Sequence, residues 1–174
     1  MRNLVSIFLV LIVFFPHLLF ADIKVYFSPN GGCQAAVISQ IQKAHKTIDI
    51  AMYYFTSREI AQTLIKAKKR GVSIRMVLDR SQRGQIYSKS KYFIKKGLAV
   101  KYHEGSGLMH NKFAVIDGEV LVTGSFNWTA TAEQKNEENL LVISGEDLSR
   151  EYEKRFEYLW MGSGDRVLKN WENK

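Results

Sequence analysis

Apolar and polar residues follow two periods along most of this chain. Alternation with a period of two, or a short apolar run, predicts β-strands over residues 23–27, 47–53, 72–78, 98–103, 113–116, 119–123 and 140–143. Apolar residues at helical spacing predict helices over residues 34–44, 57–70, 92–96 and 148–161. Strands and helices that succeed one another in this way favour right-handed βαβ crossovers, and therefore an α/β sandwich in one domain.

The first 21 residues form a segment of a different kind. Arg2 precedes an almost unbroken apolar run over residues 4–15, and the segment ends on the small residue Ala21. This order is typical of a secretory signal peptide, which would place the protein in the periplasm or outside the cell. The alternative is an uncleaved N-terminal membrane anchor, because the run approaches the length of a transmembrane helix. We therefore expect a signal peptide or anchor over residues 1–21 and the folded domain over residues 22–174.

The composition of the chain indicates which kinds of molecule it binds. The chain has 174 residues, of which 46% are hydrophobic, and a formal net charge of +8. A basic excess favours polyanionic partners, but nucleic acids and acidic membranes both present phosphates. Because Cys33 is the only cysteine, an intrachain disulfide and a cysteine metal site are excluded, and we expect this side chain to be buried.

Two short polar motifs carry the candidate chemistry. His110 and Lys112 are two residues apart where a flexible run enters a predicted strand, so their side chains project from the same face. Ser125 and Asn127 are separated in the same way by Phe126, after the next predicted strand. An imidazole can act as nucleophile, base or acid, and the ammonium, hydroxyl and amide groups suit an anionic phosphorus centre. The two pairs predict a site that cleaves phosphate esters.

Two carboxylates accompany these motifs. Glu138 precedes the predicted strand over residues 140–143, where a carboxylate is placed to hold the His110 ring in one tautomer. Asp117 and Gly118 follow the strand that begins at the first motif, and this pair is typical of a hairpin turn.

A polar and basic stretch over residues 79–91 lies between the last βαβ unit and the motifs. Arg80 and Arg83 in this stretch are candidates for contacts to substrate phosphates, and Tyr87 is a candidate for stacking on a base. The alternative is an ordinary solvated loop.

The pattern H-x-K-x-x-x-x-D followed by G-S-x-N resembles the phospholipase D superfamily. The compact length with a single motif resembles its bacterial nuclease branch and the mitochondrial cardiolipin hydrolase type. Residues 48–56 and 67–79 resemble the family's first strand-helix-strand unit, so the resemblance covers residues 22 to about 160. It implies an α/β fold of the phospholipase D type, an α-β-α sandwich with a central mixed, largely parallel sheet and one motif per chain. Residues 22–174 would then form one nuclease domain.

The resemblance also implies a mechanism, a two-step hydrolysis of phosphodiesters without metal or cofactor. His110 would attack phosphorus, and a second motif histidine would protonate the leaving oxygen and then activate water. Lys112 and Asn127 would bind the non-bridging oxygens, Ser125 would support them, and Glu138 would orient the imidazole. Asp117 completes the motif and is counted with the catalytic residues, although in this family that position serves mainly the local structure.

The number of histidines leads to a prediction about assembly. The mechanism requires two motif histidines, but of the four in this chain only His110 has a lysine two positions later. The others are His17, His45 and His103. Two chains must therefore supply one active site, which predicts a homodimer about a two-fold axis.

Three functions follow from these observations. The first is an exported endonuclease that cuts DNA or RNA with little sequence preference, because phosphate contacts carry no base information. The second is a phospholipid phosphodiesterase, with a membrane as partner if the N-terminal segment is retained or the substrate is a lipid. The third is a non-catalytic DNA-binding protein of the same fold, which is hard to reconcile with the presence of all the motif residues.

Overall fold

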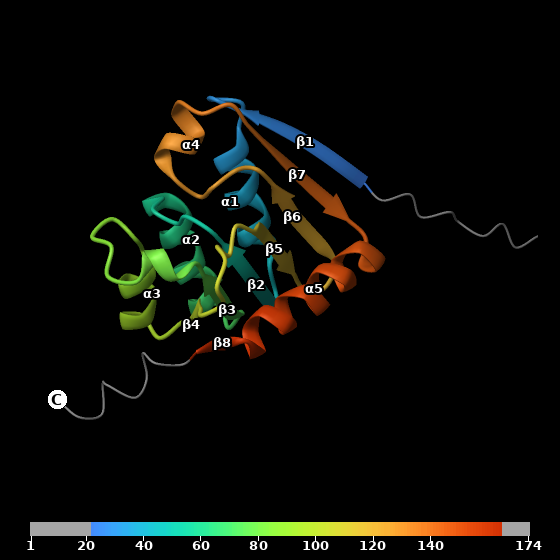
Figure 1. Ribbon diagram of the computed structural model, residues 1–174. Helices are drawn as coiled ribbons and strands as arrows, with labels where there is room; N and C mark the ends of the chain where they lie inside the picture. Colours follow the sequence, from blue (N-terminus) through green and yellow to red (C-terminus); the bar gives the residue numbers. More distant parts are fainter. Residues whose placement is uncertain (1–21, 165–174) are drawn as a thin grey trace, which may run out of the picture.

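A computed structural model describes residues 22–164 (Figure 1). The strands are β1 (Asp22–Ser28), β2 (Thr47–Met52), β3 (Ser73–Leu78), β4 (Ala99–His103), β5 (Lys112–Ile116), β6 (Val120–Gly124), β7 (Glu138–Ser144) and β8 (Ser163–Gly164). The helices are α1 (Cys33–Lys43), α2 (Arg58–Lys69), α3 (Ser90–Lys95), α4 (Ala130–Gln134) and α5 (Glu146–Met161), with a 3₁₀ turn η1 (Arg80–Gln82). The predicted signal peptide or anchor lies outside the described residues.

The strands form one sheet in the order β1-β7-β6-β5-β2-β3-β4-β8. Only the pairs β2–β3 and β3–β4 are parallel, and the five other strand pairs in the described residues are antiparallel. The expectation of a largely parallel sheet is therefore wrong. Crossovers through α2 and α3 allow parallel pairing, whereas the short turn from β5 to β6 permits only an antiparallel pair.

Helices cover both faces of the sheet, which confirms the predicted α-β-α sandwich (Figure 1). The larger core joins α1, α2, α3 and α4 to one face, and it contains Cys33, which is fully buried as expected. The smaller core lies under α5 on the other face and includes Ala51 and Phe156. All residues of β2 from Ile48 onward are buried, so the first motif is built against the most enclosed strand of the fold.

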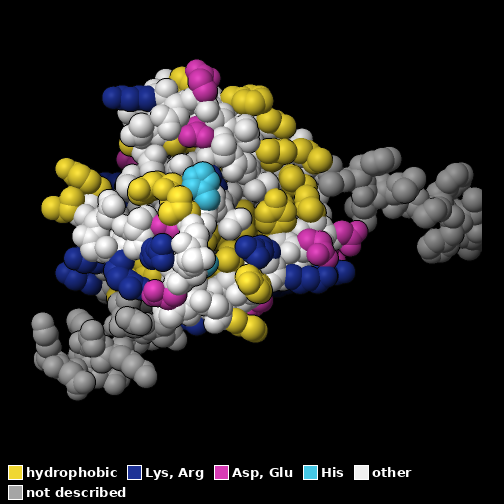
Figure 2. All heavy atoms as spheres, in the orientation of Figure 1, with side chains coloured by type: hydrophobic (Ala, Val, Ile, Leu, Met, Phe, Trp, Pro, Cys, Tyr) yellow, Lys and Arg dark blue, Asp and Glu magenta, His cyan; other side chains and the backbone are white. Residues whose placement is uncertain are grey.

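One region of the sheet stays uncovered. On the edge strand β1, Ile23, Val25 and Phe27 are 54%, 51% and 64% exposed, whereas Tyr26 packs on the larger core. The exposed residues form an apolar strip because α5 lies over β2, β3, β5 and β6 instead. Figure 2 shows hydrophobic side chains gathered over β1 and β7 on this face. A patch of this kind is typical of a contact with a protein or a membrane.

No helix within residues 22–164 combines the length and the apolar content that a membrane-spanning helix needs.

Candidate active site

The two polar motifs meet at one edge of the sheet. Met52, the last residue of β2, pairs with Lys112, the first residue of β5, and the end of β6 lies beside both β5 and β7. A hollow of about 320 Å³ opens there, lined by His110, Lys112, Gly124, Ser125, Asn127 and Glu138. Among residues 22–164, no three or more His, Cys, Asp or Glu side chains gather closely enough to hold a metal ion.

Lys112 is held against His110. Its Nζ atom donates to the His110 carbonyl at 2.7 Å and lies 3.2 Å from His110 Nδ1. The Tyr53 ring contacts both groups, at 4.9 Å from the ammonium and with a centroid distance of 4.4 Å to the imidazole. Because an ammonium only donates, Nδ1 accepts, and a neutral His110 then carries its proton on Nε2. Burial lowers the pKa of Lys112, and the charge of Glu138 opposes that shift.

Glu138 lies in the hollow, but it does not hold the His110 ring in the way the sequence suggested. No hydrogen bond joins the two side chains within the described part of the chain, and Glu138 Oε1 accepts instead from Asn136 Nδ2 at 3.1 Å. In the single chain, Lys112 and Tyr53 are the groups that contact the imidazole. Tyr53 carried no signal in the sequence beyond its place at the end of a predicted strand.

Ser125 and Asn127 are oriented as donors toward the hollow. The backbone N–H of Asn139 donates to Ser125 Oγ at 3.1 Å, which leaves the hydroxyl hydrogen for another partner. The N–H of Tyr54 donates to Asn127 Oδ1 at 3.2 Å, so the amide nitrogen is the free end of that side chain. Phe126 between them is buried in the larger core, as the spacing predicted. With Lys112, the pair offers three kinds of donor to an anion.

Gly124 permits the close approach of β6 and β7 on which this arrangement depends. Its φ is +145°, and a Cβ atom there would lie 2.3 Å from the carbonyl oxygen of Asn139. That carbonyl accepts from the N–H groups of Ser125 and Phe126 at 3.1 and 3.2 Å. The glycine of the second motif is therefore required for the backbone turn that presents Ser125.

Asp117 lies at the opposite end of β5 and is not part of the hollow. At about 3.4 Å per residue it is about 17 Å from Lys112 along the strand. Its carboxylate accepts from the N–H groups of His45, Lys46 and Thr47 at 2.9, 2.7 and 2.8 Å. Burial alone would raise its pKa, but these bonds outweigh burial and hold the pKa below its usual value. Its assignment to the catalytic group is therefore corrected to a structural one.

The hairpin turn at this end was predicted from the sequence. Asp117 and Gly118 have φ values of 55° and 73°, the left-handed pair that a type I′ turn requires.

The side chains of Arg80 and Arg83 both bind other groups of the same chain. Arg80 donates to the carbonyl oxygens of Gly105 and Ser106 at 2.9 and 3.3 Å. Arg83 forms an ion pair with Glu104 and stacks on the Tyr102 ring at 4.8 Å. Both arginines fasten the loop before His110 and neither lines the hollow, so their assignment to substrate binding is corrected.

Two buried residues that the sequence analysis missed support the same region. Asp79 accepts from the N–H of Met109 at 2.8 Å, directly before His110. Gln82 accepts from the N–H of Phe55 at 3.1 Å and donates to the Tyr53 carbonyl at 2.6 Å. A polar residue directly after a buried strand was an available signal for Asp79, because sites form at the carboxyl ends of parallel strands. Gln82 gave no such signal.

The comparison with protein families decides the assignment. A model described as "Cardiolipin synthase, PLD-like domain" matches residues 37–160, which include both motifs. The chain belongs to the phospholipase D-like family.

Two similar proteins carry different names. The phospholipase D of Rickettsia conorii is 35% identical over 132 residues, 76% of this chain and 66% of that protein. The mitochondrial cardiolipin hydrolase of Xenopus laevis is 35% identical over 124 residues, 71% of this chain and 59% of that protein. The chain thus spans two thirds or less of the length of these two relatives.

Solved structures confirm the phospholipase D-like fold. Nuc from Salmonella typhimurium, a phospholipase D family member, superposes with a TM-score of 0.79 at 30% identity and covers 83% of this chain and 97% of its own. NucT from Helicobacter pylori has the same TM-score at 23% identity, with 83% and 98% covered, and it shows the shared fold.

Proposed function

We propose that this phospholipase D-like chain is an exported phosphodiester hydrolase that cuts DNA or RNA with little sequence preference. The observation that carries the proposal is the ring of donors around His110, in which Lys112, Ser125 and Asn127 all face one small hollow. Such an arrangement matches the charge that develops on a pentavalent phosphorus centre. The net charge of +8 supports a polyanionic substrate. Export rests on the signal-peptide pattern of residues 1–21.

The reaction proceeds in two displacements. A ring nitrogen of His110 forms a bond to phosphorus while the bond to the leaving oxygen breaks, and a second histidine gives that oxygen its proton. The second histidine then takes a proton from water, whose oxygen displaces His110 and leaves a phosphate monoester. The attacking nitrogen must be unprotonated and must not be engaged in another hydrogen bond. In the structure His110 Nδ1 lies 3.2 Å from Lys112 Nζ. The ammonium of Lys112 must therefore leave Nδ1 and donate to a phosphate oxygen when the substrate binds.

The second histidine comes, in this proposal, from a second copy of the chain. Neither of the other two histidines in residues 22–164 lines the hollow. His45 adjoins the Asp117 end of β5, and His103 ends β4. The apolar strip on β1 supports such a dimer, because Phe27 pairs in register with Asn139 beside Ser125. A homodimer that covers this strip would bring two hollows together about a two-fold axis.

Mixed dimers test this arrangement. Chains carrying His110→Ala and unaltered chains would be denatured together in equal amounts, refolded and assayed. If each site needs a histidine from both chains, activity per unaltered chain falls to about half, because about half of those chains pair with an inactive partner. Full activity per unaltered chain, or an active monomer in light scattering, would contradict the shared site.

The second candidate is a phospholipid hydrolase at a membrane, favoured by the names of the relatives and by the apolar strip on β1. Purified protein would be given plasmid DNA and cardiolipin liposomes separately, each with excess chelator, beside a His110→Ala control. The nuclease proposal expects nicking that resists the chelator and is absent from the control. Turnover of lipid alone would favour the second candidate, and DNA that is bound but never cut would favour a binding protein.

A further inference from the structure

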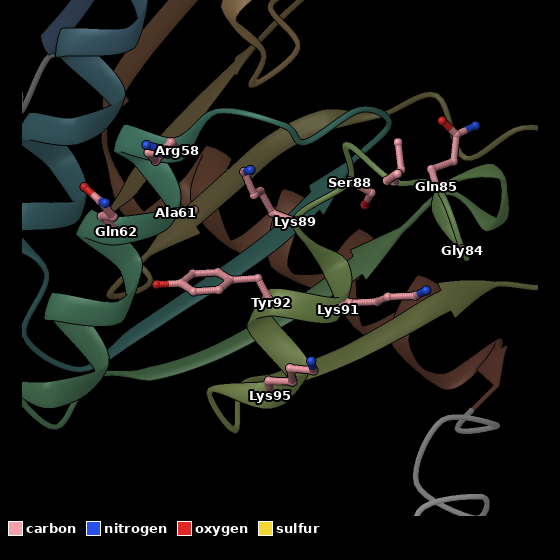
Figure 3. Close-up of a pocket in the computed structure, with 11 residues that line it drawn as sticks. Arg58, Ala61, Gln62, Gly84, Gln85, Ser88, Lys89, Lys91, Tyr92 and Lys95 are labelled. Atoms are coloured by element: carbon pink, nitrogen blue, oxygen red, sulfur yellow. The ribbon is translucent and has the colours of Figure 1, made fainter.

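A second hollow, larger than the one at His110, lies between α2 and α3. Its volume is about 720 Å³, and we call it the α2–α3 groove. Arg58 lines it from α2, Lys91, Tyr92 and Lys95 line it from α3, and Lys89 lies directly before α3 (Figure 3). The groove opens to solvent, so an extended ligand can lie along it.

The groove carries positive charge that the protein does not neutralise. Its lining includes Arg58, Lys89, Lys91 and Lys95 and no Asp or Glu. Among the residues that the structure describes, none of these four side chains forms an ion pair or a hydrogen bond. This differs from Arg83, which is paired with Glu104. The four cations are therefore available to an external polyanion.

The short segment over residues 54–58 links the groove to the His110 hollow. Tyr54 donates its N–H to Asn127, which lines the hollow. One residue further, the Phe55 carbonyl accepts from the N–H of Lys89, which lines the groove. Arg58 follows four residues after Tyr54, a span of at most about 14 Å for an extended chain. A strand that extends a few nucleotides beyond the cleaved phosphate can therefore reach the groove.

Two exposed apolar side chains lie in the lining of the groove or directly after it in the chain. Ile86 belongs to its lining and is 87% exposed, and the adjacent Tyr87 is 77% exposed. An exposed aromatic ring can stack on any unpaired base, which favours a single strand over a duplex. The cations line a concave surface, which follows a chain of phosphates better than it follows a flat bilayer.

We propose that the α2–α3 groove binds single-stranded nucleic acid next to the cleaved phosphate, with phosphates on Arg58, Lys89, Lys91 and Lys95 and a base on Tyr87. This inference rests on the proposed function, because it takes a nucleic acid as the substrate, and it adds a second place on the protein where that substrate is bound. It assigns substrate contacts to lysines of α3 and its flank instead of to Arg80 and Arg83. Strand length then becomes a determinant of affinity, whereas a small diester is bound by the His110 hollow alone.

The test compares two triple variants that each remove three positive charges. The groove variant carries Lys89→Ala, Lys91→Ala and Lys95→Ala, and the control carries Lys43→Ala, Lys46→Ala and Lys154→Ala. Binding of a fluorescein-labelled single-stranded 20-mer is followed by anisotropy over a range of KCl concentrations, with His110→Ala added to both to prevent cleavage. Since each phosphate contact contributes about 0.7 to the slope of log K against log salt, the groove variant is expected to lose about 2 from that slope.

Two further measurements separate the groove from the reaction. With His110 intact, hydrolysis of bis(p-nitrophenyl) phosphate is expected to be equal in the groove and control variants. Tyr87→Ala is expected to weaken binding of the 20-mer about tenfold, and Tyr87→Phe to retain it.

Equal salt slopes in the groove and control variants would overturn the inference. The inference would also be wrong if the groove variant bound the 20-mer with unchanged affinity but no longer bound cardiolipin vesicles. The groove would then be a membrane-binding surface. Failure of the proposed function has a different signature, because no form of the protein would then hydrolyse DNA or RNA.

Discussion

Strand β5 has polar groups at both ends, and the two ends use them differently. At one end the carboxylate of Asp117 accepts from three backbone N–H groups and adjoins no hollow. At the other end Lys112, Ser125 and Asn127 keep donors directed at an open space around His110. The same strand therefore ends in a structural clamp on one side and in a candidate reaction centre on the other.

The difference lies in how charge is compensated. The charge of Asp117 is stabilised by the protein, which is why its pKa is lowered. The charge of Lys112 is disfavoured by burial, which lowers its pKa as well, because the neutral form of an amine is the one that tolerates burial. A charge that hydrogen bonds within the protein stabilise, as at Asp117, indicates a contribution to the stability of the fold. A charge that burial disfavours, as at Lys112, indicates a place where a ligand of opposite charge binds.

Of the variants that test this difference between the two ends of β5, His110→Ala is expected to have the largest effect on activity. We expect hydrolysis of bis(p-nitrophenyl) phosphate to fall about 10³-fold or more, because the bond-forming group is removed. The midpoint of thermal unfolding should barely change, since this side chain is exposed and the fold does not depend on it. Differential scanning fluorimetry beside the kinetic assay checks both, and an active variant would refute the assignment.

Lys112 tests the role of the cation at the same end. Lys112→Ala is expected to lower kcat about 10²-fold, the usual cost of losing one donor to a developing oxyanion. The protonated form is the active one, so activity in the unaltered protein should decline as pH rises through a pKa below that of an ordinary lysine. Lys112→Arg stays charged and should move that alkaline decline to higher pH. A pH profile identical in the two proteins would exclude Lys112 as the titrating group.

Gly124→Ala is expected to impair both stability and activity. The added Cβ meets the backbone oxygen of Asn139, so β6 and β7 must separate at a cost of about 2–4 kcal/mol, and Ser125 moves with them. Gly107→Ala is a suitable control, because nothing lies within 4 Å of its Cβ position. Urea unfolding and kcat would be measured for both, and a Gly124→Ala protein as stable as the control would contradict the close approach.

Asp117→Ala should change stability alone. Losing three bonds to a carboxylate is expected to lower the free energy of unfolding by about 2–3 kcal/mol, while activity per folded molecule stays the same. A carboxyl group with a lowered pKa stabilises the fold above its unfolded pKa of about 3.9, and the effect fades as pH falls through the folded value. Urea unfolding at pH 7 and at pH 3 should therefore show a gap between the two proteins that narrows in acid.

The local patterns in the sequence predicted most of the fold, and long-range pairing accounts for what they missed. Period-two alternation located the strands and placed His110 beside Lys112 and Ser125 beside Asn127. Strand direction depends on which segments become neighbours, so a family-based expectation of a largely parallel sheet was wrong. The helix α4 was missed because five residues are too short to show a helical period.

Contacts between residues far apart in the sequence also explain why Arg80, Arg83 and Glu138 do not have the roles that the sequence predicted. Arg80 and Arg83 appear in the sequence as available cations, but their partners in residues 104–106 come from a loop more than 20 positions away. Glu138 is near Lys112 without bonding His110 in one chain. No local pattern carries information of that kind.

The buried thiol of Cys33 makes the chain well suited to site-directed labelling. Burial raises the pKa of this cysteine to about 11, so at neutral pH hardly any reactive thiolate exists and alkylating reagents cannot reach the sulfur. A single cysteine introduced at the exposed Leu108 would then be the only modified position. Spin labels there would report the spacing between two copies directly, without first removing a native cysteine.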